Sequence, residues 1–91
     1  MINLKSEINN YLINCTSQKN LSSHTLKAYR IDLTQFLLFK ENMSLSKSNL
    51  TEYIQELHTK YKPKTVKRKI ASLKAFVHYL YFEDLIESNP F

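Results

Sequence analysis

Glycine does not occur in this chain, and proline occurs only at positions 63 and 90. Because glycine adopts positive φ more readily than any other residue, a chain without it has few places for tight turns and hairpins. Apolar residues recur at spacings of three and four along most of the sequence, which is the period of an amphipathic helix. The 91 residues are therefore expected to form one all-α domain with one core.

Four segments carry the helical period, and each starts at a residue that favours a helix terminus. Helices are expected from Asn3 to about Gln18, from about His24 to Lys40 behind a cap from Ser22 or Ser23, from the capping box of Asn49 and Glu52 to about Lys60, and from Pro63 to a stop at Ser88-Asn89-Pro90-Phe91. A turn at Lys19 to Leu21 and a polar loop at Glu41 to Lys47 separate the first three.

The last of these helices has two different faces. Its core seam is expected to be Val66, Ile70, Leu73, Val77 and Leu80. The opposite side is expected to carry Lys64, Lys67, Arg68, Ala71, Ala75 and His78. Two alanines within a basic face leave little bulk between the helix backbone and a ligand, so this side is suited to a close approach to a duplex.

Positive charge is concentrated in residues 60–74, which hold seven of the thirteen Lys and Arg residues and no acidic one. The rest of the chain holds six basic residues against all eight acidic ones, so the net charge of +5 comes from this segment. A charge run is usually only a solvated face. Seven cations without an interleaved anion, however, lack the i, i+4 ion pairs of an ordinary surface helix, and this favours a phosphate-bearing partner. Arg30, near the start of the second helix, adds a further donor.

Other kinds of site find little support. The three histidines fall on different elements without Cys, Asp or Glu at ligand spacing, so neither a metal nor another cofactor is expected. The single cysteine, Cys15, lies on an apolar face and is expected to be a buried structural thiol. Glu52 and Glu56 are expected on a solvated face.

No apolar run approaches the ~18 residues of a membrane span, and a cytoplasmic protein is expected.

The tyrosines give no reason to expect catalysis. Tyr11, Tyr29, Tyr53 and Tyr79 sit beside core positions, and they are expected to pack there with their hydroxyls at the surface. A tyrosine nucleophile without Arg or His partners would be inert.

Two blocks about 40 residues apart carry a more specific pattern. Residues 21–33 contain Ser, a Thr-Leu pair, Tyr and Asp-Leu in order, and residues 64–76 contain Thr, Arg, then Ser-Leu and a basic residue before an aromatic one. With the terminal Asn89-Pro90-Phe91, these blocks resemble the N-terminal core-binding domain of tyrosine recombinases, the phage-integrase and Xer-type family, over about residues 4–91. Lys62-Pro63 departs from the family, which commonly has a serine or another capping residue there.

The resemblance implies a compact orthogonal bundle of four main helices of the SAM-like type, forming half of a clamp around a recombination half-site in double-stranded DNA. It also implies that a separate C-terminal domain, outside this single domain of residues 1–91, cuts and rejoins the strands, together with other recombinase protomers on the DNA. This chain is thus not expected to be an enzyme by itself. The positions implied to contact DNA are His24, Thr25 and Lys27 in the first block and Lys64, Thr65, Lys67, Arg68 and Ser72 in the second.

Two other functions remain open from the sequence. A helix-turn-helix regulator is disfavoured because the link before the candidate recognition helix lacks the usual glycine and no dimerisation segment is visible. A SAM-like protein interaction module with an acidic partner is the alternative from a different class. Neither the target sequence nor a mobile-element as opposed to a chromosomal role can be deduced.

Overall fold

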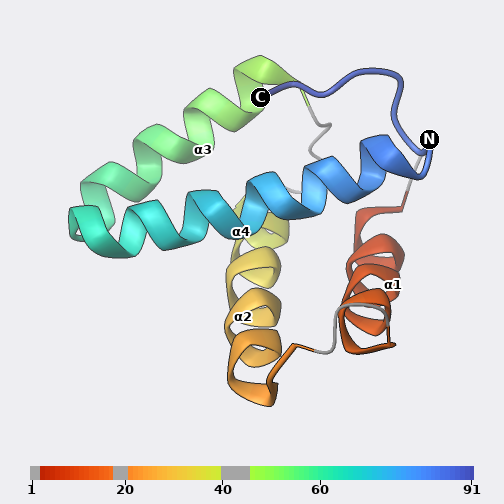
Figure 1. The fold of residues 1–91 in the computed structure, drawn as a ribbon. Helices are drawn as coiled ribbons and strands as arrows, with labels where there is room; N and C mark the ends of the chain where they lie inside the picture. The colour runs from red at the N-terminus through yellow and green to blue at the C-terminus, as the bar shows by residue number, and fades with distance from the viewer. Residues whose placement is uncertain (1–2, 18–20, 40–45) are drawn as a thin grey trace.

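The computed structural model describes residues 3–17, 21–39 and 46–91, and these form four helices (Figure 1). They are α1 (Leu4–Ser17), α2 (Ser23–Phe39), α3 (Lys47–Lys60) and α4 (Pro63–Phe82). No strand occurs in these three ranges, and the expected all-α fold is confirmed. The expected turn at Lys19 and Asn20, the helix ends at Gln18 and Lys40, and residues 41–45 of the polar loop lie outside the described residues.

Short polar side chains begin the first three helices. At α1, the Ser6 amide donates to the Asn3 side-chain oxygen over 3.1 Å. At α2, the Ser22 hydroxyl accepts the Thr25 amide over 3.2 Å, so Ser22 rather than Ser23 fills the capping position. At α3 the predicted start at Asn49 is wrong. Ser46 is the N-cap and its side chain accepts the Asn49 amide over 3.1 Å, so α3 begins at Lys47.

Both ends of α4 follow from backbone chemistry. Pro63 lies in the first turn as predicted, and Lys62 caps the helix without a side-chain hydrogen bond. The predicted stop at Pro90 is wrong, because α4 ends at Phe82. There Asp84 takes a left-handed φ of 59°, and the Leu85 amide donates back to the Leu80 carbonyl over 2.9 Å. This reversal satisfies a carbonyl of the last turn and ends the helix eight residues before the proline.

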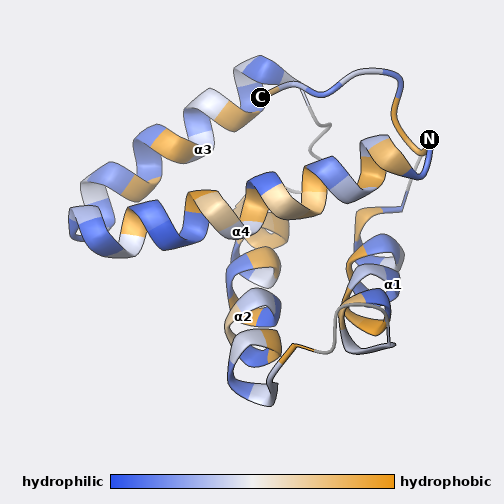
Figure 2. Cartoon of the chain, in the orientation of Figure 1, coloured by the Kyte–Doolittle hydropathy of each residue, from blue (hydrophilic) through white to orange (hydrophobic). Residues whose placement is uncertain are grey.

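Helix α4 is the central element of the fold. In Figure 1, α1 and α2 lie side by side and α4 crosses both, while α3 folds back from the start of α4. Helix α4 packs against each of the other three helices. The apolar (orange) bands of Figure 2 recur along all four helices, whereas the first turns of α4 are mostly hydrophilic. The basic half of α4 is therefore also the half that packs beside α3.

Aromatic rings fill the core on both sides of α4. The Tyr11 ring centroid lies 5.5 Å from that of Phe76 and 5.1 Å from that of Tyr79, so α1 packs against the C-terminal half of α4. The Tyr53 ring meets Phe36 edge-on at 5.1 Å and ties α3 to α2. The predicted seam of α4 is largely confirmed, but Ile70 is only partly buried, and three other side chains of α4 are buried beside the seam: Lys69, Ser72 and Phe76.

Candidate nucleic-acid interface

One face of α4 is exposed and basic along most of its length. Its members recur at helical spacing and are all exposed: Lys64, Lys67, Ala71, Lys74 and His78. None of these three lysines forms an ion pair with another described residue. The face differs from the prediction at Ala75, which is partly buried and packs on the core. Only Ala71 therefore leaves a gap in the basic surface.

Lys69 does not belong to this surface, although it was counted with it. Its side chain is 3 % exposed, and its ammonium lies 3.0 Å from the equally buried Asp32 carboxylate of α2. The same ammonium donates to the Gln35 side-chain oxygen and lies over the Tyr61 ring, 4.9 Å from its centroid. Lys69 thus serves as a buried link between α2 and α4. It leaves six exposed cations in residues 60–74.

Arg68 lies at the border between the basic face and α2. Its side chain is 54 % exposed, and one of its terminal nitrogens donates to the Asp32 carboxylate over 2.9 Å. Lys60 pairs with Glu56 over 3.0 Å. The premise that the seven cations lack anionic partners is therefore wrong for three of them: Lys60 pairs with Glu56 of the same helix, and Arg68 and Lys69 share Asp32 of α2.

Ser72 was predicted to contact DNA, but the structure places it in the interior. Its hydroxyl donates to the second Asp32 carboxylate oxygen over 2.9 Å, and the residue is 3 % exposed. Burial leaves no surface of Ser72 for a direct contact with a duplex. Its observed partner makes it part of the α2 to α4 link.

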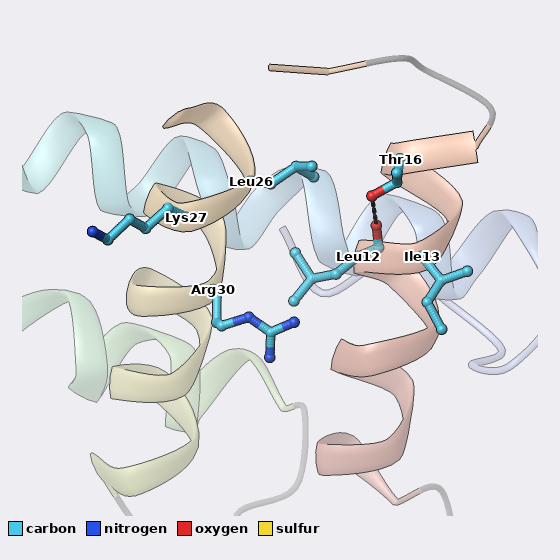
Figure 3. Close-up of a pocket in the computed structure, with 6 residues that line it drawn as sticks. All are labelled: Leu12, Ile13, Thr16, Leu26, Lys27 and Arg30. Carbon is cyan, nitrogen blue, oxygen red and sulfur yellow. Dashed lines mark hydrogen bonds between the residues drawn. The ribbon is translucent and has the colours of Figure 1, made fainter. Parts of the chain in front are cut away.

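The first turns of α2 present the other predicted residues. His24 and Lys27 are exposed, while Thr25 and, on α4, Thr65 are partly buried. The Thr25 hydroxyl lies 3.0 Å from that of Ser22. Figure 3 shows that Lys27 points away from α1 whereas the exposed Arg30 points toward it, so the two cations do not share a direction.

Between α1 and α2 lies a shallow depression of about 260 Å³ (Figure 3). Its floor is apolar, with Leu12, Ile13 and Leu26, and its polar lining comes from Thr16, Lys27 and Arg30. The Thr16 hydroxyl donates to the Leu12 carbonyl over 3.0 Å. Nothing in this lining resembles a set of catalytic groups.

The buried tyrosines correct a further expectation. Tyr11 and Tyr53 are 1 % and 4 % exposed, so their hydroxyls lie inside the protein rather than at its surface. Burial raises the pKa of Tyr53 to about 12, with a smaller contribution from the Asp32 charge, and burial also raises the pKa values of Tyr11 and Tyr79. A higher pKa makes these phenols weaker sources of a nucleophilic phenolate at neutral pH.

Cys15 is buried, as predicted. His24, His58 and His78 are all exposed and lie on three different helices. Within the described part of the chain, no group of three or more His, Cys, Asp or Glu side chains is placed to hold a metal ion. No helix in the same part combines the length and the apolar character needed to cross a membrane.

Asp32 is the residue that the sequence analysis missed. It is 3 % exposed and holds three side chains of α4: Arg68, Lys69 and Ser72. A signal was present, because Asp32 follows Tyr29 by three residues and precedes Phe36 by four, which is a core position of α2. An acidic residue at such a position implies a buried partner, since an unpaired buried charge is costly.

The chain is similar to known proteins over almost its whole length. The family described as phage integrase, N-terminal SAM-like domain, matches residues 8–84. A tyrosine recombinase of Agathobacter rectalis is 48% identical over 94 residues, covering 100% of this chain and 31% of that protein. Tyrosine recombinase XerC of Thermodesulfovibrio yellowstonii is 40% identical over 93 residues, covering 99% of this chain and 31% of that protein.

XerC of Staphylococcus saprophyticus is 36% identical over 87 residues, covering 89% of this chain and 29% of that protein. The chain thus spans about a third of the length of the curated relatives it matches. No solved structure matches it.

Proposed function

Because this chain belongs to the family of phage integrase N-terminal SAM-like domains, we propose that it binds double-stranded DNA as the core-binding part of a tyrosine recombinase. In this role it binds one half-site of a recombination site in the cytoplasm. A C-terminal domain cuts and rejoins the strands, and other recombinase protomers bind the remaining half-sites.

The exposed lysines of α4 are the observation that supports this proposal most strongly. Lys64, Lys67 and Lys74 lie on one face and make no ion pair within the described residues, so their charges are available to phosphates. Ala71 lies between the last two and adds little bulk. A duplex can therefore approach the helix backbone closely along this face.

The start of α2 supplies a second set of contacts in the proposal. His24 and Lys27 are exposed there, and the helix start also offers positively polarised amides that favour phosphate. Thr25 and Thr65 are partly buried, and in the proposal their exposed atoms contact the DNA. Arg30 points toward α1, so it is proposed to contact the DNA only at the margin of the interface. Buried Ser72 is assigned an indirect role.

A salt titration tests the proposal. Binding of a fluorescent 20-bp duplex of arbitrary sequence is measured by anisotropy at rising NaCl. If about six phosphates are contacted, the logarithm of affinity falls with the logarithm of salt with a slope near −5. A slope near zero, or no binding at low salt, rules out the DNA-clamp function.

A competitor separates DNA binding from an acidic protein partner. Poly-glutamate carries a comparable density of negative charge but lacks the shape of a duplex, so it should displace the labelled duplex only weakly. Poly-glutamate that binds as tightly as duplex DNA at equal charge concentration would favour the protein-interaction alternative.

The same domain is proposed to leave DNA uncut by itself. Tyr11 and Tyr53 are buried and cannot meet a phosphodiester in this fold, and the chain has only two arginines to line a phosphate pocket. Incubation with a nicked or intact recombination site should yield no covalent adduct on denaturing gels, and an adduct on any tyrosine would contradict the assignment.

A further inference from the structure

The Asp32 carboxylate lies directly behind the guanidinium of Arg68. The Asp32 side chain is 1 % exposed, whereas the Arg68 side chain is 54 % exposed, and a bond of 2.9 Å joins them. Only one terminal nitrogen of Arg68 has a hydrogen-bond partner among the described residues. The buried end of the guanidinium is thus anchored while its remaining N–H groups are available to solvent.

The carboxylate itself is held firmly. Lys69 donates to the same oxygen over 3.0 Å, and the Ser72 hydroxyl donates to the other oxygen over 2.9 Å. Gln35 in turn accepts from the Lys69 ammonium. Because several hydrogen bonds fix the rotamer of Asp32, its carboxylate restricts the orientation of Arg68 more strongly than a mobile carboxylate would.

We infer that Asp32 is a positioning residue that orients Arg68 for reading the sequence of DNA bound to α4. The inference rests on the proposed function. Arg68 carries a planar fork that can donate to the two acceptors on a guanine edge, which lysine cannot do with the same geometry. Fixing one end of the fork reduces the conformational entropy that Arg68 loses when it binds a base, and it limits the directions from which a base is accepted.

The charges of this cluster are compatible with such a role. Asp32 contributes one negative charge, and Arg68 and Lys69 contribute two positive ones, so the cluster stays net positive. The carboxylate is covered by the protein, so it presents almost no surface that could repel a phosphate. Buried Lys69 already pairs with Asp32, so the half-exposed Arg68 is an additional partner rather than the only neutralising one.

The opposite role is that Asp32 keeps Arg68 from contacting DNA. The two roles predict opposite effects of removing the Asp32 carboxylate on binding to the favoured sequence. If Asp32 positions Arg68, removing the carboxylate lowers the preference for the favoured sequence. If Asp32 withholds Arg68, removing it raises the affinity for that sequence.

The variants are chosen to keep the domain folded. Asp32→Asn alone would leave the Lys69 ammonium buried without a counter-charge, which is strongly destabilising. Lys69→Met is therefore the reference variant, because it keeps the bonds from Arg68 and Ser72 to Asp32. The double variant Asp32→Asn/Lys69→Met then removes the carboxylate without stranding the ammonium. Thermal melts followed by circular dichroism establish that both variants are folded.

The probes are a 20-bp duplex enriched on the unaltered domain from a randomised pool and a duplex of scrambled sequence. The measured quantity is the ratio of the two affinities at one salt concentration. In Lys69→Met this ratio should stay within about twofold of that of the unaltered domain. In the double variant the ratio should fall about tenfold, which is the contribution expected of one bidentate base contact. A ratio that does not change, or that rises, overturns the inference.

Repeating the comparison with Arg68→Lys in both variants shows whether Asp32 acts through Arg68, because lysine keeps a positive charge beside Asp32 but lacks the planar fork. In that background the removal of the carboxylate should have no further effect on the ratio. An equal loss in the Arg68→Lys background would mean that Asp32 affects binding only through the fold, and the inference would fail. NMR of the Arg68 side-chain N–H groups provides a readout without DNA, and these signals should broaden or average when Asp32 is neutralised.

Failure of this inference can be told apart from failure of the proposed function. If the unaltered domain binds duplex DNA with the expected salt slope but the pool yields no enriched sequence, positioning for readout is wrong and general DNA binding stands. If the unaltered domain binds no duplex at all, both are wrong.

Discussion

Lys69 and Asp32 form a buried ion pair, with 3.0 Å between the ammonium nitrogen and a carboxylate oxygen and almost no solvent exposure of either side chain. The pair joins α4 to α2 at their crossing. Removing one member of a buried ion pair leaves the charge of the other member without compensation. The loss of folding stability therefore depends on whether Asp32 or Lys69 is removed and on which groups still bond the one that remains.

The two members of this pair should differ in their effect on stability. Asp32→Ala leaves the Lys69 ammonium buried without an anion and is expected to lower the free energy of unfolding by about 3–5 kcal/mol. Lys69→Met should cost clearly less, because Arg68 and Ser72 still bond the carboxylate. Urea unfolding followed by circular dichroism measures both values, and equal costs would show that the bonds from Arg68 and Ser72 contribute little.

The core seam of α4 offers a matched pair of truncations. Leu73 is 2 % exposed, and Leu73→Ala should cost about 2–5 kcal/mol through lost burial and the cavity that remains. Ile70 lies on the same seam but is only partly buried, so Ile70→Ala should cost about 1 kcal/mol. If the Ile70 variant is the less stable of the two by urea unfolding, the observed orientation of α4 is contradicted.

Tyr53 should make the domain sensitive to alkaline pH. Its pKa is about 12 in the folded protein against 10.0 for an ordinary tyrosine, so the unfolded chain loses the proton first. Stability from this group is complete below pH 10 and falls as the pH rises toward 12. Tyr53→Phe should therefore weaken the decline in the free energy of unfolding above pH 10.

At neutral pH the same variant should be neutral or slightly stabilising, because the buried Tyr53 hydroxyl has no hydrogen-bond partner within the described residues. Exposed Tyr81 supplies the control, since Tyr81→Phe should leave the alkaline decline unchanged. A Tyr53→Phe profile that coincides with that of the unaltered protein would contradict the assignment.

Asp84 provides a test of how α4 ends. Since its φ is 59°, Asp84→Gly should relieve the cost of a left-handed residue and raise stability by about 0.5–1 kcal/mol. The neighbouring Glu83 has a φ of −86°, so Glu83→Gly should give no such gain. Thermal melts compare the two, and a stabilised Glu83 variant together with an unaffected Asp84 variant would reverse the interpretation.

Lys67 tests the proposed DNA surface against simple net charge. Lys67→Ala should weaken binding to all duplexes and reduce the salt slope by about one. Lys47→Ala removes the same charge from the first turn of α3, away from the proposed contacts, and should change the slope far less. Equal effects of the two variants in anisotropy titrations would show that overall charge, rather than this face of α4, determines binding.

The sequence predicted much of this fold because its helices are encoded locally. The spacing of Leu33 and Phe36 in α2, or of Leu73 and Val77 in α4, is visible without any tertiary information, and both pairs are buried. The start of α3 was misplaced because Ser46 and Asn49 both favour a cap, and only the geometry shows that Ser46 accepts from Asn49. The end of α4 was misplaced because a left-handed Asp84 has no sequence signal comparable to a proline or glycine.

The candidate site was less predictable, because its organisation depends on contacts between distant residues. Lys69 looks like its basic neighbours in sequence, and its burial follows from an aspartate 37 residues earlier. Ser72 was assigned to DNA contact through the family resemblance, and its burial follows from a bond to the same aspartate. Exposure of Lys64 and Lys67 followed from the helical period alone and was predicted correctly, whereas their contacts with DNA stay a prediction.

The meeting of Tyr11 with Tyr79, at 5.1 Å between ring centroids, has a consequence for how the chain folds during synthesis. Helix α1 leaves the ribosome before α4, which carries the Phe76 and Tyr79 rings that pack on Tyr11. The core around Tyr11 therefore cannot be completed before the second half of α4 is available. A chain cut short before Phe76 keeps the stacking of Tyr11 on Tyr29 of α2 but lacks the two α4 rings that pack on Tyr11.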